Sequence, residues 1–197
     1  WPRAPTTSIP PPVRLAPPYR FTREDYHAMA EAGILGEDDP VELIAGEIVT
    51  QMPIGTAHAS MVNRLNHLLT RLSAGRLIVS VQNPVGLDPF TEPEPDVALL
   101  RPIPDFYAQS HPEPEDVLLI VEVADTSLAF DREEKIPLYA AAGIAEVWLV
   151  DLVDKSLSVY RQPAQGAYTE TTRHRSGAAI PIPGLPETQL AVSELGL

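Results

Sequence analysis

Two apolar runs, each with a single acid inside it, constrain the fold more than any other feature of the sequence. Asp96 lies in "EPDVALL" at residues 94–100, and Glu122 lies in "LLIVEVADTS" at residues 118–127. Continuous apolar runs are typical of strands that are covered on both faces. A buried carboxylate is costly without a partner, so each acid needs an arginine, a network of donors or a divalent metal ion.

The remaining segments surround these two strands with helices and hairpins. Residues 21–34 are predicted to form a helix, because Thr22 and Asp25 match a capping box. A hairpin is expected over residues 41–49, and a second helix with one apolar face is expected over residues 57–72.

Strands and one further helix are predicted in the second half of the chain. Proline or glycine flanks the strand candidates, and Pro137 inside the predicted helix 131–143 implies either a start near Ile136 or a kink after Lys135. The chain is therefore predicted to be an α/β protein with a mixed sheet flanked by helices and extra β-hairpins. The strand candidates are residues 76–83, 85–90, 95–100, 117–124, 145–152 and 156–162.

Composition restricts the domain count and the partners. Seven of the 22 prolines lie within residues 1–18, so residues 1–19 are predicted to be an extended arm and residues 20–197 a single domain. The net charge of −13 opposes indiscriminate binding to phosphate backbones. No signal peptide or membrane span is expected, and the absence of cysteine fits a reducing cytoplasm.

Asp96, Glu122 and Lys135 together suggest phosphoryl-transfer chemistry. Acids at the ends of neighbouring strands can share one Mg²⁺ ion, and a lysine on the following helix can reach the same volume. The metal would activate water, and the ammonium would offset charge in the transition state. Alternatively, Asp96 caps a turn, Glu122 pairs with an arginine and Lys135 is a solvated helix residue.

Several motifs resemble those of one known family. "VELIAGEI", "GTAHASMVNRLNHLL", "EPDVALL", "VEVADTS", "DREEKIPLYAAAGIAEVWLVD" and "SVYRQP" occur in the order seen in the Uma-two family. The resemblance covers residues 20–162 and implies a restriction-endonuclease-like fold of the PD-(D/E)XK nuclease superfamily. It also implies a mixed sheet of four or five strands with a divalent metal at its acidic edge.

The resemblance assigns catalytic roles to three residues. Asp96 and Glu122 match the family's metal-binding acids, with Mg²⁺ or Mn²⁺ as the implied cofactor, and Lys135 matches its lysine. The superfamily places that lysine two residues after the glutamate, where this chain has Ala124. The superfamily pattern is therefore matched by the two acids, while the lysine lies on the following helix.

Four further residues are candidate accessory groups. Glu42 adds a ligand or forms a salt bridge at the hairpin edge, and His58 binds a metal or phosphate or is structural. Gln82 hydrogen-bonds into the site or satisfies backbone groups at a strand end. Tyr139, one turn after Lys135, is expected to pack in the core with its hydroxyl toward the acidic edge.

Three functions are compatible with these features. The first is a metal-dependent nuclease that hydrolyses phosphodiester bonds in DNA and acts as a homodimer or higher homo-oligomer. The second is a non-catalytic binding or assembly module with the same fold, which the net charge and the displaced lysine favour. The third is a phosphodiesterase that acts on a small nucleotide.

Overall fold

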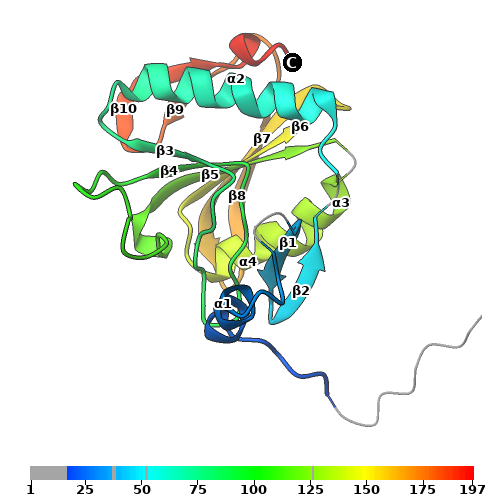
Figure 1. Ribbon diagram of the computed structural model, residues 1–197. Helices are drawn as coiled ribbons and strands as arrows, with labels where there is room; N and C mark the ends of the chain where they lie inside the picture. The colour runs from blue at the N-terminus through cyan, green and yellow to red at the C-terminus, as the bar shows by residue number, and fades with distance from the viewer. Residues whose placement is uncertain (1–16, 37–38, 52, 126) are drawn as a thin grey trace, which may run out of the picture.

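The computed structural model describes residues 17–36, 39–51, 53–125 and 127–197. Its centre is a six-stranded sheet with the order β3-β4-β5-β6-β7-β8 (Figure 1). Only β5 and β6 pair in parallel, so the predicted mixed sheet is confirmed, with six strands rather than four or five. The strands are β3 (Ile78–Val81), β4 (Val97–Leu100), β5 (Val117–Ala124), β6 (Glu146–Asp151), β7 (Ser156–Ala164) and β8 (Ala167–His174).

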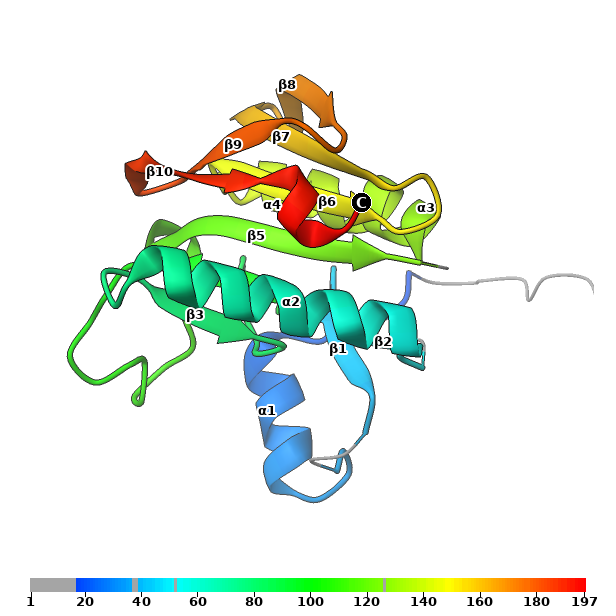
Figure 2. The same ribbon diagram turned by 90° about the horizontal axis from the view of Figure 1, so that it is seen from above.

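Different elements cover the two faces of the sheet. The long helix α2 (Thr56–Ser73) lies on one face beside the hairpin of β9 (Ala179–Ile182) and β10 (Leu185–Ala191), as Figure 2 shows from above. The 3₁₀ turn η3 (Val192–Leu195) completes this layer. The opposite face packs against a helical segment made of α3 (Leu128–Phe130), η2 (Asp131–Lys135) and α4 (Ile136–Ala141).

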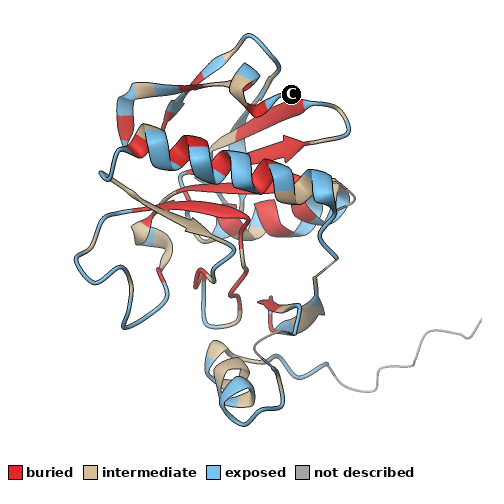
Figure 3. Ribbon diagram, turned by 45° about the horizontal axis from the view of Figure 1, so that its top comes forward, coloured by how far each residue is buried: buried red, intermediate tan, exposed pale blue. Residues whose placement is uncertain are grey.

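The apolar side chains of α2 explain its position. Met61, Val62, Leu65, Leu68 and Leu69 are buried on one face of the helix, as their three- and four-residue spacing predicts. The outer face is exposed, and the contrast is visible in Figure 3. The predicted helix over residues 57–72 is therefore confirmed.

Helix α1 (Arg23–Glu31) and the hairpin of β1 (Val41–Ile44) and β2 (Glu47–Thr50) lie below the sheet (Figure 1). The predicted capping box at the start of α1 is present. Ala45 and Gly46 both have positive φ, as the two central residues of a type I′ hairpin turn require. No residue of α1 is fully buried, and polar contacts such as the Tyr26 hydroxyl to Val41 O and the Arg23–Glu92 ion pair help to attach this helix.

The connection between the parallel strands β5 and β6 contains a π-helical turn. The backbone N–H of Ile136 donates to Asp131 O, which is an i to i+5 bond, and Pro137 lies at the start of α4. The missing N–H of proline is tolerated at the start of a helix. The structure thus combines the two predicted alternatives, because a wider turn ends at Lys135 and a regular helix begins at Ile136.

The strand predicted over residues 85–90 is wrong. This segment forms an irregular loop with one isolated bridge, between Asp88 and Thr91. Pro84, Pro89 and Pro93 lack the N–H groups that a continuous ladder needs.

Residues 1–16 of the predicted arm lie outside the described residues. None of the helices in the described part of the chain has the length and hydropathy needed to cross a bilayer.

Candidate active site

The register of β4 and β5 places Asp96 opposite Glu122. Val97 pairs with Val121 and Ala98 with Ile120, so the next pair toward the loop is Asp96 and Glu122. Opposite residues of an antiparallel pair project from the same face of the sheet. Both acids therefore project toward the face that α4 covers, at the end of the ladder.

The contacts of Asp96 fix its side chain at the sheet rim. Its Oδ2 accepts a hydrogen bond from the backbone N–H of Val123 at 2.8 Å and lies 3.0 Å from His58 Nε2. Its own N–H points toward Glu122 Oε2 at 3.4 Å. No hydrogen bond to Asp96 Oδ1 is found among the described residues, which leaves this oxygen free for a ligand.

Glu122 is buried between two groups of the β5–β6 connection. Tyr139 donates its hydroxyl hydrogen to Glu122 Oε1 at 2.5 Å, and Lys135 Nζ lies 3.6 Å from the same oxygen. Lys135 and Tyr139 are four residues apart on one continuous helical segment, which brings both to the same carboxylate. The tyrosine ring itself is fully buried in the core on the α4 side.

Lys135 also joins the sheet to the β1–β2 hairpin. Its Nζ lies 3.1 Å from Glu42 Oε2, and the side chains of both residues are buried. The same Glu42 oxygen accepts a hydrogen bond from the backbone N–H of Glu94 at 3.1 Å. A single lysine therefore neutralises carboxylates from two separate strands.

Burial and charge shift the ionisation of these groups. Burial raises the pKa of Glu122 above its usual range, and this effect outweighs the opposing attraction of the Lys135 ammonium. The pKa of Lys135 is also raised: burial opposes the charged form, but Glu122, Glu42 and Asp131 together outweigh it. The hydrogen bond to Asp96 raises the pKa of His58, so proximity to the acid favours an imidazolium.

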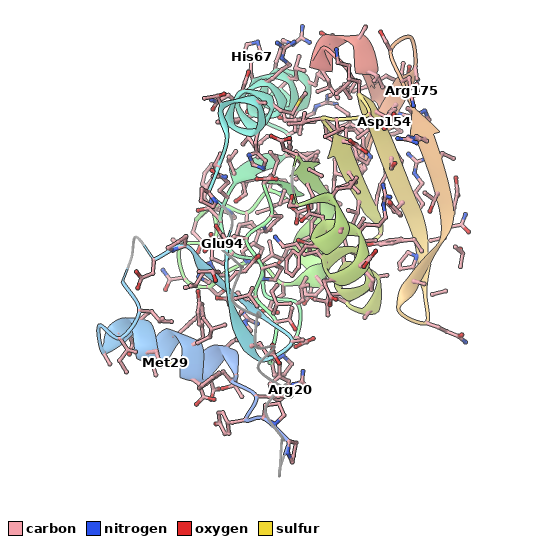
Figure 4. The ribbon with its side chains drawn as sticks, turned by 90° about the vertical axis from the view of Figure 1, so that its right-hand side faces the viewer. Arg20, Met29, His67, Glu94, Asp154 and Arg175 are labelled. Carbon is pink, nitrogen blue, oxygen red and sulfur yellow. The ribbon has the colours of Figure 1, made fainter. Side chains whose placement is uncertain are left out.

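These side chains line a cavity of about 740 Å³. Its walls carry one lysine and one histidine together with six carboxylates, while Ile54 and Phe130 form an exposed apolar margin. Glu94 projects toward this region from the loop before β4 (Figure 4). The carboxylates are those of Glu42, Glu94, Asp96, Glu122, Asp125 and Asp131.

All seven residues singled out in the sequence lie at or beside this cavity. Gln82 lines it and has a positive φ, while its backbone N–H donates to Asp96 O at 3.2 Å. His58 lines it from the start of α2, and its Nδ1 is buried with no hydrogen-bond partner among the described residues. Tyr139 lies behind Glu122 rather than in the wall.

Sequence reasoning missed several polar residues of the cavity, among them Gln51, Glu94 and Asp131. Gln51 donates to Glu94 Oε2 at 3.1 Å, and burial raises the pKa of Glu94. Asp131, whose pKa burial also raises, accepts a hydrogen bond from Ser127 at 2.6 Å. The alternation of acids in "EPEPD" is a signal that could have indicated Glu94, but no local pattern marks Gln51 or Asp131.

The donor set fits a hard divalent cation. Asp96 and Glu122 offer carboxylate oxygens at the cavity wall, and Mg²⁺ commonly binds one or two carboxylates while it retains several waters. Asp96 Oδ1, to which no hydrogen bond is found among the described residues, is one oxygen that could bind it.

A family comparison decides the classification. The model of the Uma2 family, described as "Putative restriction endonuclease", matches residues 23–193. The chain belongs to the Uma2 family. The match includes the candidate site and all six strands of the central sheet. It also includes the β1–β2 hairpin and the β9–β10 hairpin.

A solved structure shows the same fold. The crystal structure of a putative nuclease belonging to DUF820 from Anabaena variabilis ATCC 29413 superposes with a TM-score of 0.66. The two sequences are 18% identical, and the similarity covers 89% of this chain and 97% of that one. Among curated proteins, none matches this Uma2 chain. The restriction-endonuclease-like fold is thus supported by both comparisons.

Proposed function

We propose that this Uma2 protein is a metal-dependent nuclease that hydrolyses phosphodiester bonds in DNA. The observation that carries the proposal is the pairing of Asp96 opposite Glu122, with Lys135 Nζ 3.6 Å from Glu122. The family description as a restriction endonuclease and the nuclease title of the DUF820 structure agree with it.

Asp96 and Glu122 would hold Mg²⁺ or Mn²⁺, and such an ion supplies Lewis-acid polarisation of a phosphoryl oxygen and a more acidic bound water. The protein's own groups keep the two acids in place. Val123 N–H and His58 orient Asp96, while Tyr139 holds Glu122 Oε1. Preorganised ligands of this kind need no rearrangement when substrate binds.

Lys135 provides the positive charge of the site. Its ammonium lies between Glu42 and Glu122 at the cavity wall, where it can donate a hydrogen bond to an attacking water or to a phosphate oxygen. A fixed cation beside the reacting phosphate stabilises negative charge that develops in the transition state. We therefore assign Lys135 to positioning and charge stabilisation.

The test is nicking of supercoiled plasmid by the full chain with Mg²⁺ or Mn²⁺. Cleavage is expected with either ion and is expected to stop when a chelator removes it. Asp96→Asn should reduce the rate below detection, and Lys135→Ala should reduce it about 100-fold or more, the effect typical of losing a transition-state donor.

The chain provides matched controls for both substitutions. Lys155, its only other lysine, lies in the β6–β7 turn, and Asp105 is exposed on the loop after β4. Lys155→Ala and Asp105→Asn should cleave at the wild-type rate. Cleavage that persists in Asp96→Asn, or wild-type protein that binds the ion without nicking, would refute the nuclease proposal.

A second candidate is a phosphodiesterase that acts on a small nucleotide. The cavity volume of about 740 Å³ lies in the range of small-molecule sites, and its apolar margin can contact a base. Its six carboxylates and the net charge of −13 oppose a long phosphate backbone. Turnover of a small phosphodiester reporter, without duplex binding at low salt, would favour this candidate over DNA.

We further propose a homodimer for the nuclease, because cleavage of both strands of a duplex requires two sites. Light scattering on the purified chain would measure its mass in solution. A dimer that linearises plasmid in one encounter is the expected result, while a monomer that only nicks would restrict the activity to one strand.

A further inference from the structure

A second cluster of potential metal ligands lies beside α1, outside the acidic cavity. His27, Glu92 and His111 each offer one ligand atom, and these atoms lie within 4.8 Å of one another. No other group of three such residues in the described part of the chain meets this limit. The three residues come from α1, from the loop before β4 and from the loop before the 3₁₀ turn η1 (Pro114–Asp116).

Glu92 is the buried centre of this cluster. Its side chain is 1% exposed, and its backbone N–H donates to Leu43 O at 2.8 Å. Arg23 Nε binds Glu92 Oε2 at 2.7 Å, whereas Oε1 faces His27 Nε2 at 2.6 Å. One carboxylate oxygen is thus fixed by arginine, and the other is in contact with His27.

The two imidazoles converge on the same side of this carboxylate. The rings of His27 and His111 meet edge to face with their centroids 5.8 Å apart. His27 lies four residues after Arg23, so α1 presents both side chains to Glu92. The side chain of His111 forms no hydrogen bond with the described residues, which leaves its ring nitrogens available.

We propose that His27, Glu92 and His111 bind a divalent transition-metal ion, with Zn²⁺ as the representative. Two imidazoles and a carboxylate are ligands that Zn²⁺ accepts at about 2.0–2.2 Å, with water as a fourth ligand. A tetrahedral site needs ligand atoms about 3.3 Å apart, so the 2.6 Å pair must open by less than about 1 Å, and any pair near the 4.8 Å limit must close by about 1.5 Å.

Arg23 would orient the site rather than bind the ion. Its Nη1 pairs with Glu113 at 2.8 Å, which offsets the arginine charge next to a cation. The guanidinium lies against Gly86, where any side chain would collide with it. Fixed partners of a ligating carboxylate typically affect metal affinity by about 10- to 100-fold.

The role of this ion would be structural. Helix α1 has no fully buried residue, and its contacts with the loop before β4 include the ion pair of Arg23 with Glu92. A metal bound by α1 and two loops would join three segments that are distant in sequence, and binding free energy of this kind stabilises the fold. The proposed ion is independent of the Mg²⁺ or Mn²⁺ of the acidic cavity, which contains different residues.

The test measures Zn²⁺ affinity of the chelator-stripped full chain, by competition with a chromophoric chelator, and absorbance after Co²⁺ addition. His111→Gln is the critical variant, because its side chain has no described hydrogen bond to lose. We expect His27→Gln and His111→Gln each to weaken Zn²⁺ binding by more than about 100-fold. Loss of a residue that only orients a ligand typically weakens metal binding by about 10- to 100-fold, so a larger loss indicates a direct ligand. The Co²⁺ bands of a low-coordinate site should disappear in both variants.

His67→Gln is the matched control. His67 is exposed on α2, at the opposite end of the molecule from Met29 of α1 (Figure 4). This control and Asp96→Asn should both retain the high-affinity Zn²⁺ site, and His111→Gln should retain nicking with Mg²⁺. Equal Zn²⁺ affinity in wild type and His111→Gln, or loss of the site only in Asp96→Asn, would overturn the proposal without affecting the nuclease assignment.

Discussion

Glu122 and Glu92 are both buried glutamates, but different cations neutralise them. Glu122 lies 3.6 Å from the ammonium of Lys135, which it shares with Glu42. Glu92 has Arg23 on one oxygen at 2.7 Å and His27 on the other at 2.6 Å. The cation at Glu122 is the compact ammonium of Lys135, beside a cavity. The cation at Glu92 is the planar guanidinium of Arg23, which fixes the orientation of the carboxylate.

This difference determines how easily each cation can change its hydrogen-bond partners. A lysine shared by two acids can redirect its hydrogen bonds when a metal or phosphate enters, because its three donors rotate freely. The arginine at Glu92 is locked by Glu113 and Gly86 and cannot redirect in this way. The same type of buried acid thus supports different roles according to its partner.

The largest expected effect is that of Lys135→Met on stability. Removal of the ammonium leaves Glu42 and Glu122 buried without their counter-charge, which should lower the free energy of unfolding by about 3–5 kcal/mol. Urea denaturation at neutral pH measures the change. Adding Glu122→Gln to this variant should recover part of the loss, and Lys155→Met should have almost no effect. A loss equal to that of Lys155→Met would show that Lys135 does not balance these acids.

Arg23→Met should have the next largest effect. Its side chain is 21% exposed, so solvent can partly replace the lost contact with Glu92, and we expect a loss of about 2 kcal/mol. Arg71→Met, which removes an exposed pair with Glu194, should cost less than about 1 kcal/mol. If Arg23→Met destabilises the protein more than Lys135→Met does, Glu122 does not depend on its cation more strongly than Glu92 does, and the proposed distinction between the two glutamates is wrong.

Tyr139→Phe should have the smallest effect of the three. It removes only the hydroxyl that donates to Glu122 Oε1 and keeps the buried ring, so the expected loss is about 1–2 kcal/mol. The nicking rate should also fall, because Glu122 loses one of its orienting partners. Unchanged stability and rate would show that Lys135 alone determines the position of this carboxylate. Calorimetry and the plasmid assay on the same preparation give both values.

Local sequence patterns predicted the regular elements well. The capping box of α1, the turn at Ala45 and Gly46, and the apolar face of α2 depend on residues close together in the chain. The strands that carry Asp96 and Glu122 were marked by their continuous apolar runs. The proline-rich segment between residues 84 and 95 was not predictable in the same way, since tertiary hydrogen bonds determine its path.

Contacts distant in sequence explain what was missed at the sites. Arg23 and His27 meet Glu92 across 69 and 65 positions, and no local period indicates such pairs. The position of Lys135 could be inferred from its helix. Its contact with Glu42 of β1, which it makes in addition to that with Glu122, could not be inferred from the sequence. The sequence therefore indicated residues that lie at or beside one cavity, while their partners required the tertiary structure.

The π-helical turn before α4 makes the geometry of the acidic cavity sensitive to chain length. Five residues, Asp131–Lys135, occupy this turn, and the i to i+5 bond from Ile136 closes it. Because an i to i+5 turn holds one residue more than an α-helical turn, deletion of one residue here would change how Asp131 and Lys135 are presented to the cavity. Substitutions in the turn can be tolerated where a single deletion cannot, so relatives of this chain should vary in the composition of this segment far more than in its length.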